Sequence, residues 1–313
     1  MVDTNRMELI LICQNTGHYT HRRIAEEALC LGISVILASY SSIEVFIHNE
    51  VKVLVAGSDC LEKPLAVFLD GPGPYTVLRN FLIRYLTDKG VYVLNQNSFL
   101  AWPTLSKLTQ MYQLQQCGIP IVPTQMFANS SQLEVALGDL TNPMIAKAVD
   151  GSGGNGTWKI TSDEELKIGP LRYYAPYHLL IQPKIVAQVE FRVIVLGNSL
   201  VGGVAKSPAS GDFRANWRQG GELVNTVLPP IVEEISLRSS QAVKCEFAGI
   251  DILYTKNGSD EECWVLEVNR YFGFNGFEQT THINVASLLV RWIQDRPQCP
   301  LPGEISSVAG KQQ

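Results

Sequence analysis

The sequence predicts an α/β protein whose first third forms a small parallel sheet and whose remainder carries further strands and helices. The 313 residues are 46% hydrophobic, which is enough to bury two or three modest cores. Short β-branched runs alternate with stretches of helical spacing over roughly the first ninety residues, a pattern typical of parallel sheets. The expected strands are Met7–Cys13, Ile33–Ala38, Val51–Val55, Leu65–Leu69 and Val91–Leu94, and the expected helices are Arg22–Cys30 and Thr76–Thr87.

Charge and cysteine usage narrow the class of protein. The formal net charge is −5, which disfavours a nucleic-acid partner because the surface would repel a polyanion. Seven scattered cysteines without a CxxC pair are typical of reduced thiols. The N-terminal apolar run of about six residues is far below the ~20 that a membrane span needs. We therefore expect a cytoplasmic protein that has no membrane segment.

The later two-thirds of the chain continue the alternation without an internal repeat. A helix is expected over Ser98–Gln116, another over Val232–Lys244, and a closing helix over Ile283–Asp295. The expected strands are Ile145–Val149, Thr157–Ile160, Leu179–Gln182, Val189–Leu196, Ala248–Leu253 and Cys263–Val268. The tail after Pro297 is rich in polar residues, so we expect it to fray. The segment after the first expected strand lacks GxGxxG, which argues against a Rossmann cofactor site.

Three oxygen-bearing side chains lie in two apolar strands near the C-terminus. Asp251 sits within Gly249–Leu253, and Glu267 and Asn269 share one face of the following strand by period-2 alternation. Mg²⁺ accepts such hard oxygen ligands, and substrate phosphates and water complete its octahedron. The alternative is that Asp251 or Glu267 pairs with Arg192 or a lysine. The spacing of all three favours the metal site.

Buried cations and glycine-rich loops form the other candidate features. Lys147 lies in an apolar strand and requires an anionic partner, and it is followed by the glycine-rich segment 151–156, whose backbone could close over phosphates. Arg192 lies in the apolar strand that also carries Glu190. The segment 211–221 holds Arg214 and Asn216 between glycines. A flexible hairpin and a solvated turn remain the alternatives for the two glycine-rich segments.

Read together, these segments resemble the ATP-grasp superfamily, and specifically the RimK-type ligases. The resemblance runs from about Leu94 to Asp295. Its most specific stretches are GDFRANWRQGG (211–221), AGIDIL (248–253), LEVN (266–269) and GFEQTTHINVASLLVRWIQ (276–294). It implies an ATP-grasp fold with three parts: an N-terminal parallel α/β pre-ATP-grasp domain over 1–97, a central lid domain over 98–184, and a C-terminal mixed-sheet domain over 185–313.

The resemblance also implies a role for each matching residue. Lys107 and Lys147 would hold the nucleotide phosphates, under a lid formed by Gly153, Gly154 and Gly156. The hinge that contacts adenine would contain Gln182, Lys184 and Ile185. Glu190 would contact the ribose, and the phosphate side would be contacted by Arg214 and Asn216. Asp251, Glu267 and Asn269 match the metal ligands, and Arg192 matches an arginine that stabilises the acyl phosphate and the tetrahedral intermediate. Three features depart from the family. Pro183 replaces a common glutamate, and the segment between the hinge and Glu190 is shorter by about two residues. Arg270 begins an unusual loop that is expected to bind a substrate carboxylate.

The implied reaction is ADP-forming ligation of a carboxylate to the amine of an amino acid or peptide, with ATP and two Mg²⁺ ions, for which Mn²⁺ can substitute. A carboxylate resists attack by amines, so activation as an acyl phosphate splits the reaction into two easier steps. Lys147, Arg192 and Arg214 are the expected catalytic cations. Two alternatives stay open: a nucleotide-binding module without ligase activity, and a phosphoryl transferase of the same fold. The acceptor, the amino acid and a homo-oligomeric state are not determined by the sequence.

Overall fold

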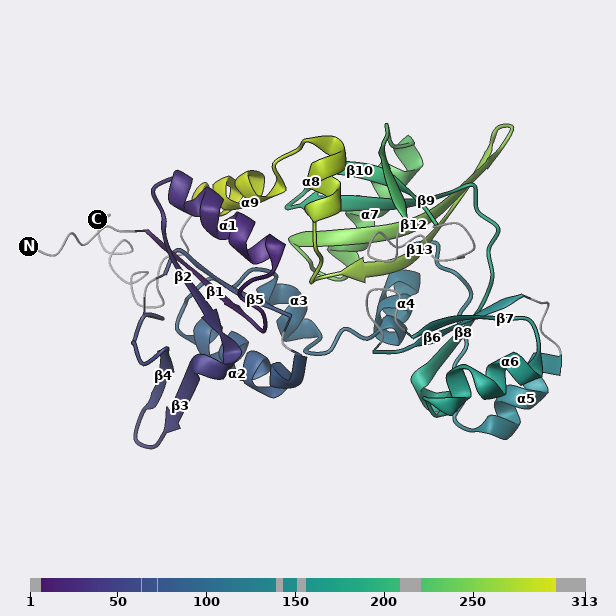
Figure 1. The fold of residues 1–313 in the computed structure, drawn as a ribbon, viewed down its shortest axis with the longest axis horizontal. Coiled ribbons are helices and arrows are strands. Elements are labelled where there is room, and N and C mark those ends of the chain that lie inside the picture. Colours follow the sequence, from purple (N-terminus) through teal and green to yellow (C-terminus); the bar gives the residue numbers. More distant parts are fainter. Residues whose placement is uncertain are drawn as a thin grey trace, which may run out of the picture. The chain divides into compact units, whose positions relative to one another are not determined.

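The computed structural model describes residues 7–62, 64–71, 73–138, 143–150, 156–208 and 221–296. The chain divides into two compact units (Figure 1). The first comprises Met1–Pro103, Gly273–Asn275 and Asn284–Gln313, and the second comprises Thr104–Phe272 and Gly276–Ile283. The closing helix thus belongs to the first unit. The division into three domains at residues 97 and 184 stays a prediction.

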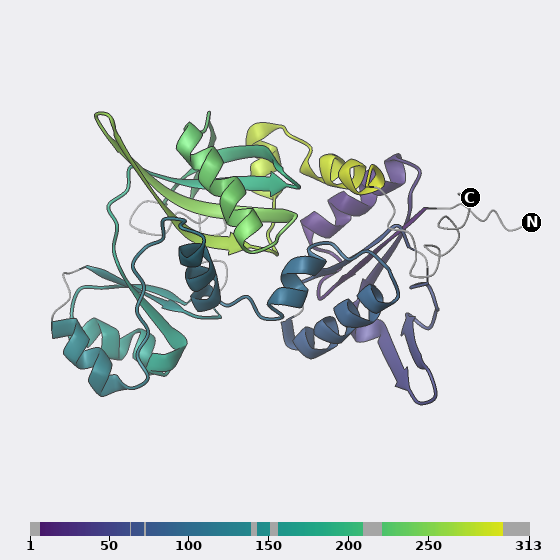
Figure 2. The ribbon, with the colours of Figure 1, turned by 180° about the vertical axis from the view of Figure 1, so that it is seen from behind.

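A three-stranded parallel sheet in the order β2-β1-β5 forms the centre of the first unit. The strands are β1 (Glu8–Cys13), β2 (Ser34–Ser39) and β5 (Ala66–Asp70). Leu9, Ile10, Leu11 and Ile12 on β1 are at most 1% exposed, as expected for a strand covered on both faces. Helix α1 (Tyr19–Cys30) lies on one face with α9 (Val285–Gln294), and α2 (Thr76–Asp88) lies on the other (Figures 1 and 2).

Two of the strands expected in this parallel sheet are placed differently. Val51–Val55 is β4, which pairs antiparallel with β3 (Ile43–Ile47) in a separate two-stranded sheet. Val91–Leu94 forms no strand and contributes a single bridge between Val93 and Val67. A β-branched run of five residues predicts extended backbone, but it does not specify the partner strand, and here a short turn offers a local one.

The helix expected over Ser98–Gln116 is two helices, α3 (Gln96–Ala101) and α4 (Lys107–Gln116). The break follows from Pro103, which has no N–H to donate and disfavours helical backbone at the preceding residue. Trp102 accordingly has φ −137° and ψ 88°. Ser106 then caps α4, because its side chain accepts a hydrogen bond from the Thr109 N–H. Lys107 is therefore the first residue of a new helix. The closing helix begins two residues later than expected, at α9, after α8 (Asn275–Thr281).

The second unit contains two antiparallel sheets. A three-stranded sheet in the order β7-β6-β8 consists of β6 (Met144–Ala148), β7 (Thr157–Ile160) and β8 (Leu179–Pro183). Its core includes Leu133 of α5 (Ser130–Gly138) and Leu166 of α6 (Asp163–Ile168). A larger five-stranded sheet in the order β11-β10-β9-β12-β13 has α7 (Pro230–Ala242) across one face (Figure 2). Its strands are β9 (Val189–Leu196), β10 (Ser199–Ser207), β11 (Glu222–Asn225), β12 (Phe247–Asn257) and β13 (Asp260–Asn269).

Short 3₁₀ turns complete the described chain: Tyr40–Ser42, Gly73–Tyr75, Pro170–Arg172 and Pro176–His178. Within the described residues, every helix is too short or too polar to cross a membrane. The predicted mixture of parallel and antiparallel sheets is confirmed.

Candidate active site

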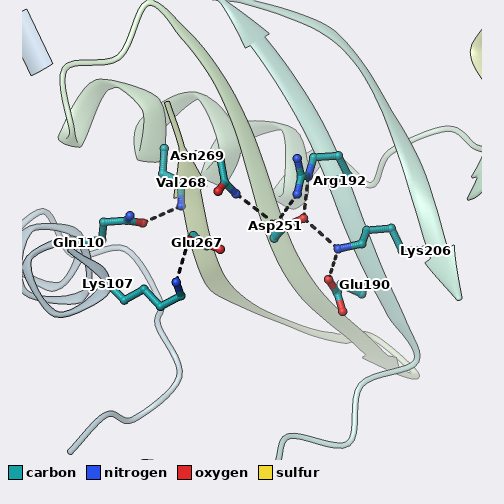
Figure 3. A network of polar contacts seen from close by, with 9 residues as sticks. All are labelled: Lys107, Gln110, Glu190, Arg192, Lys206, Asp251, Glu267, Val268 and Asn269. Carbon is teal, nitrogen blue, oxygen red and sulfur yellow. Dashed lines mark hydrogen bonds and ion pairs between the residues drawn. The ribbon is translucent and has the colours of Figure 1, made fainter. Parts of the chain in front are cut away.

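The two carboxylates predicted to bind metal face each other across neighbouring strands. Asp251 on β12 is paired in register with Glu267 on β13, and the register shifts immediately afterwards, between Asp251 and Ile252. Such a bulge redirects side chains at a functional edge. Asn269, two residues beyond Glu267, donates from Nδ2 to Asp251 Oδ2 at 3.3 Å. The structure therefore brings together all three residues of the predicted group (Figure 3).

Asp251 is 6% exposed and is held by two cations. Arg192, its cross-strand partner on β9, donates from Nε to Oδ1 at 2.8 Å and from NH2 to Oδ2 at 2.7 Å. Lys206 donates to Oδ1 at 3.1 Å. Burial works to raise the pKa of Asp251, but the charges and hydrogen bonds of Arg192 and Lys206 outweigh it and lower the pKa to about 2. The pairing of Asp251 with Arg192, considered as the alternative to a metal site, is thus present in the structure.

Lys206 is a residue of this site that the sequence analysis missed. It lies on β10 directly opposite Glu190 on β9, and its Nζ contacts both Glu190 and Asp251. Burial raises the pKa of Glu190, and the charge of Lys206 opposes this. Lys206 lies within the largely apolar run Ser199–Ser207. A lysine in an apolar strand needs an anionic partner, and this feature had indicated a functional role for Lys147.

The two lysines predicted to hold phosphates approach the carboxylates from other elements. Lys107, at the start of α4, lies 3.3 Å from Glu267 Oε1. Lys147 on β6 is half-buried. Burial lowers the pKa of Lys147, and the charges of Glu267 and Glu190 only partly oppose this effect. Both ammonium groups therefore lie within electrostatic range of the carboxylate cluster, where a polyanion would relieve the cost of burying them.

A buried glutamine joins α4 to β13. Gln110 is 5% exposed, and its Oε1 accepts a hydrogen bond from the Val268 N–H at 2.8 Å (Figure 3). Its Nε2 donates to the Leu105 carbonyl at 3.3 Å. Val268 lies between Glu267 and Asn269 on the edge strand β13. The sequence analysis missed Gln110, although it lies one helical turn after Lys107.

The remaining predicted residues within the described part of the chain lie around β6 and β8, except Arg270, which follows β13. Gln182 is buried and donates to Thr124 Oγ1 at 2.8 Å, so its side chain is engaged within the protein. The Lys184 N–H donates to the Pro143 carbonyl at 3.0 Å, and the Gly156 carbonyl accepts from the Ala148 N–H at 2.7 Å. Ile185 lies just beyond β8 and Arg270 just beyond β13, both half-buried.

Four predicted residues, Gly153, Gly154, Arg214 and Asn216, lie outside the described residues. The roles of these four, and of the other residues predicted at the site, stay predictions.

The donor set fits a hard divalent cation. Asp251, Glu267 and Asn269 offer oxygen atoms from adjacent strands, which suits Mg²⁺ when phosphate oxygens and water complete the coordination. The described residues contain no group of three or more His, Cys, Asp or Glu side chains that could hold a metal alone. Two carboxylates and an amide are therefore the oxygen donors that these two strands could offer to a metal.

Comparison with known proteins identifies the family. Residues 104–293, more than half of the chain, match the family described as the RimK-like ATP-grasp domain. The chain belongs to the RimK-like ATP-grasp family. The predicted resemblance and fold are confirmed, and with them the class of carboxylate–amine ligase.

Two relatives of this RimK-like protein are named as glutamate ligases. It is 26% identical over 298 residues to a probable alpha-L-glutamate ligase of Legionella pneumophila (strain Corby), which covers 93% of this chain and 96% of the relative. It is 30% identical over 218 residues to the ribosomal protein bS6–L-glutamate ligase of Escherichia coli O81 (strain ED1a). This match covers 68% of this chain and 70% of the relative.

A solved structure shows the same fold. The ATP-grasp ligase PsnB, complexed with a minimal precursor, Mg and ADP, superimposes with a TM-score of 0.68 at 16% identity. The superposition covers 91% of this chain and 96% of that chain.

Proposed function

We propose that this RimK-like protein joins a carboxylate to the amine of an amino acid or peptide and releases ADP and phosphate. The observation that carries the proposal is the convergence of Asp251, Glu267 and Asn269 from β12 and β13, with Lys107 beside Glu267. Such a cluster can hold a metal-bound triphosphate and leave its terminal phosphate accessible to a carboxylate.

The proposed ligation has two steps. A substrate carboxylate oxygen attacks the γ-phosphorus of ATP, the bond to the bridging oxygen breaks, and ADP leaves. The amine nitrogen then attacks the acyl carbon, the bond from that carbon to the phosphate oxygen breaks, inorganic phosphate leaves, and the amine proton passes to solvent. Lys107 and Lys147 would offset negative charge on the phosphates, and Arg192 would face the oxyanion that develops in the second step.

Asp251, Glu267 and Asn269 would hold the metal. When bound, Mg²⁺ supplies Lewis-acid stabilisation of charge on the phosphate oxygens. Two ions, with Mn²⁺ as a substitute, remain part of this proposal. The roles of Arg214 and Asn216 at the phosphates, and of Gly153, Gly154 and Gly156 as a lid, are proposed from the family resemblance alone.

Glutamate is the first amino acid to test, because two relatives are named for it. The acceptor is proposed to be a peptide or a small-molecule carboxylate. Arg270, at the end of β13 and half-buried, is proposed to bind a substrate carboxylate, since a guanidinium can hold one with two parallel hydrogen bonds. A cytoplasmic location without nucleic-acid or membrane partners, and a homo-oligomeric state, are further parts of the proposal.

An ADP-release screen across pairs of carboxylates and amino acids tests this function. Hydroxylamine can replace the amine, because it traps an acyl phosphate as a hydroxamate. The proposal predicts ADP and hydroxamate in equal amounts, and loss of both in Glu267→Gln but not in Lys256→Met, an exposed lysine distant from Asp251 along β12. Nucleotide binding without ADP release would favour the non-catalytic module. ADP with a phosphorylated product that resists hydroxylamine would favour the phosphoryl transferase.

A further inference from the structure

Protein donors already occupy every acceptor position of Asp251. Oδ1 accepts from Arg192 Nε and Lys206 Nζ, and Oδ2 accepts from Arg192 NH2 and Asn269 Nδ2. A carboxylate offers about four lone-pair positions, so these four hydrogen bonds use all of them (Figure 3). A metal ion needs a lone pair directed at it. At least one of these donors must therefore leave before Asp251 can bind a cation.

Lys206 is the donor best suited to leave. Its bond to Asp251 is 3.1 Å long, whereas the two bonds from Arg192 are 2.8 and 2.7 Å. The bond from Asn269 is longer still, at 3.3 Å, but Asn269 is neutral, so its departure would leave the positive charge beside Asp251 unchanged. Arg192 is fixed as the cross-strand partner of Asp251, and its planar fork matches the carboxylate. Lys206 has a flexible stem and a second partner, Glu190, directly opposite on β9. When Lys206 leaves Asp251, its ammonium is still paired.

The charges around Asp251 oppose the entry of a cation alone. Among the described residues, the cations Lys107, Lys147, Arg192 and Lys206 surround the carboxylates Glu190, Asp251 and Glu267. This cluster carries no excess negative charge that would attract Mg²⁺. A nucleotide polyphosphate changes this balance, because it adds negative charge and gives the lysines new partners.

We propose that Lys206 is a resident counter-ion of Asp251 that keeps the metal site closed until a nucleotide is bound. The divalent cation then enters with the nucleotide or after it, and Lys206 moves from Asp251 toward Glu190 or the phosphates. Lys206 is a positioning residue in this account, because it acts on the metal through Asp251. The inference rests on the proposed nucleotide and metal site, and it adds an order of binding to that site.

Binding of Mn²⁺ to the full chain tests this order. Free Mn²⁺ is measured by electron paramagnetic resonance in titrations with and without ADP, and the Mn²⁺–ADP complex is measured separately without protein. For the wild-type protein, we expect affinity for Mn²⁺ to be at least tenfold weaker without ADP than with it. In Lys206→Met, the affinity of the nucleotide-free protein should rise at least tenfold. Lys206→Arg, which keeps the charge, should restore the dependence on ADP.

Two control variants test whether the gain in Mn²⁺ affinity depends on Lys206 and Asp251. Lys256→Met removes a lysine from the same strand as Asp251, where it pairs with Glu261 at 2.7 Å, and should leave Mn²⁺ binding unchanged. Adding Asp251→Asn to Lys206→Met should abolish the gained affinity. Circular dichroism and thermal melting show whether each variant folds. Should Lys206→Met fail to fold, Lys206→Ala provides a second side chain that has neither a charge nor a hydrogen-bond donor.

The inference is overturned if wild-type protein binds Mn²⁺ equally well with and without ADP, or if a folded, neutral Lys206 variant shows no gain. Failure of the proposed function looks different. ADP binding is measured without divalent cations, in EDTA, with a fluorescent ADP analogue. If ADP binds while Mn²⁺ binding is independent of it, only the order of binding is wrong. If neither ADP nor ATP binds under any condition, the proposed function itself fails.

Discussion

Arg192 and Asp251 face each other across β9 and β12, and the guanidinium donates to both carboxylate oxygens at 2.8 and 2.7 Å. The pair fixes the orientation of a carboxylate that is also proposed to bind metal. It also leaves Arg192 oriented by a partner rather than free to rotate. Arg192 thus orients Asp251, the proposed metal ligand, and is itself proposed to stabilise the oxyanion.

Replacing Arg192 by lysine should preserve the charge but lose the two parallel hydrogen bonds. We expect kcat to fall by about 10²–10³, the range typical of losing an oxyanion donor, with a smaller effect on the KM for ATP. Steady-state ADP release checks this prediction. An unchanged kcat in a folded Arg192→Lys protein would remove Arg192 from the reaction.

Lys147→Met should make the protein more stable but weaken its binding of nucleotide. Burial lowers the pKa of Lys147, so its charge costs free energy in the folded state. Removing the ammonium should raise the free energy of unfolding by about 1 kcal/mol, and should weaken ADP binding by about 10–100-fold through the loss of a charge-assisted bond. Thermal melting and ADP titration measure the two effects.

The pH dependence of this variant has a defined sign. A lysine with a lowered pKa penalises the folded state at pH values below that pKa, and the penalty disappears as pH rises. The stability gained by Lys147→Met should therefore shrink as pH increases. Lys159→Met on the neighbouring strand β7, where the side chain is exposed, is the matched control. Lys159→Met should neither raise the free energy of unfolding nor weaken the binding of ADP.

Gln110→Leu should impair catalysis although Gln110 lies outside the carboxylate cluster. The change leaves the Val268 N–H and the Leu105 carbonyl without their hydrogen-bond partner, at a cost of about 1–3 kcal/mol. Because Val268 lies between two proposed metal ligands, we expect kcat/KM to fall about tenfold, in the range for misplaced catalytic groups. Gln115→Leu on the exposed side of α4 is the control. Equal activities of the two variants would contradict the positioning role.

The first unit contains a partly buried ion pair whose contribution to stability depends on pH. His21 Nε2 lies 2.5 Å from Asp70 Oδ2, and its Nδ1 lies 3.0 Å from the Asn15 carbonyl. Burial works to lower the pKa of His21, but hydrogen bonds and charge from Asp70 and Cys13 raise it to about 10. Since this pKa is above the ordinary value of 6.5, the charged pair stabilises the fold fully below about pH 6.5. The contribution is lost as pH rises toward about 10.

His21→Gln should therefore destabilise the first unit by about 2 kcal/mol at pH 6. This is less than the ~3–5 kcal/mol typical of a fully buried pair, because the Asp70 side chain is 26% exposed. The difference from wild type should narrow by pH 10. Hydrogen exchange of the amides of β1 and β5 measures it. His48→Gln, in the exposed turn between β3 and β4, should show no such trend.

The sequence was sufficient to predict that Asp251, Glu267 and Asn269 lie together, because their signal is local. Polar residues at period 2 in apolar strands must share a face, and the pairing of β12 with β13 then brings Asp251 opposite Glu267. Lys206 and Gln110 were missed because their partners lie on other elements. The sequence of β10 does not indicate that Lys206 reaches across to Asp251, and a glutamine in a helix is ordinarily a surface residue.

Elements were wrongly predicted where two physical rules competed. Helical spacing over Ser98–Gln116 outweighed the local effect of Pro103, which divides the segment into α3 and α4. Val51–Val55 was correctly predicted as a strand, but its β-branched residues could not distinguish a parallel sheet from the hairpin with β3. The first error overlooked a local signal, whereas the second concerns strand pairing, which depends on parts of the chain that a local window does not include.

The central claim is that a substrate carboxylate attacks ATP directly. The most direct test supplies an acceptor carboxylate labelled with ¹⁸O, found by the ADP-release screen, together with its amine and ATP. The account predicts one ¹⁸O atom in the inorganic phosphate for each amide bond formed, with ADP as the only nucleotide product. Unlabelled phosphate, or ¹⁸O in AMP released with pyrophosphate, would contradict it.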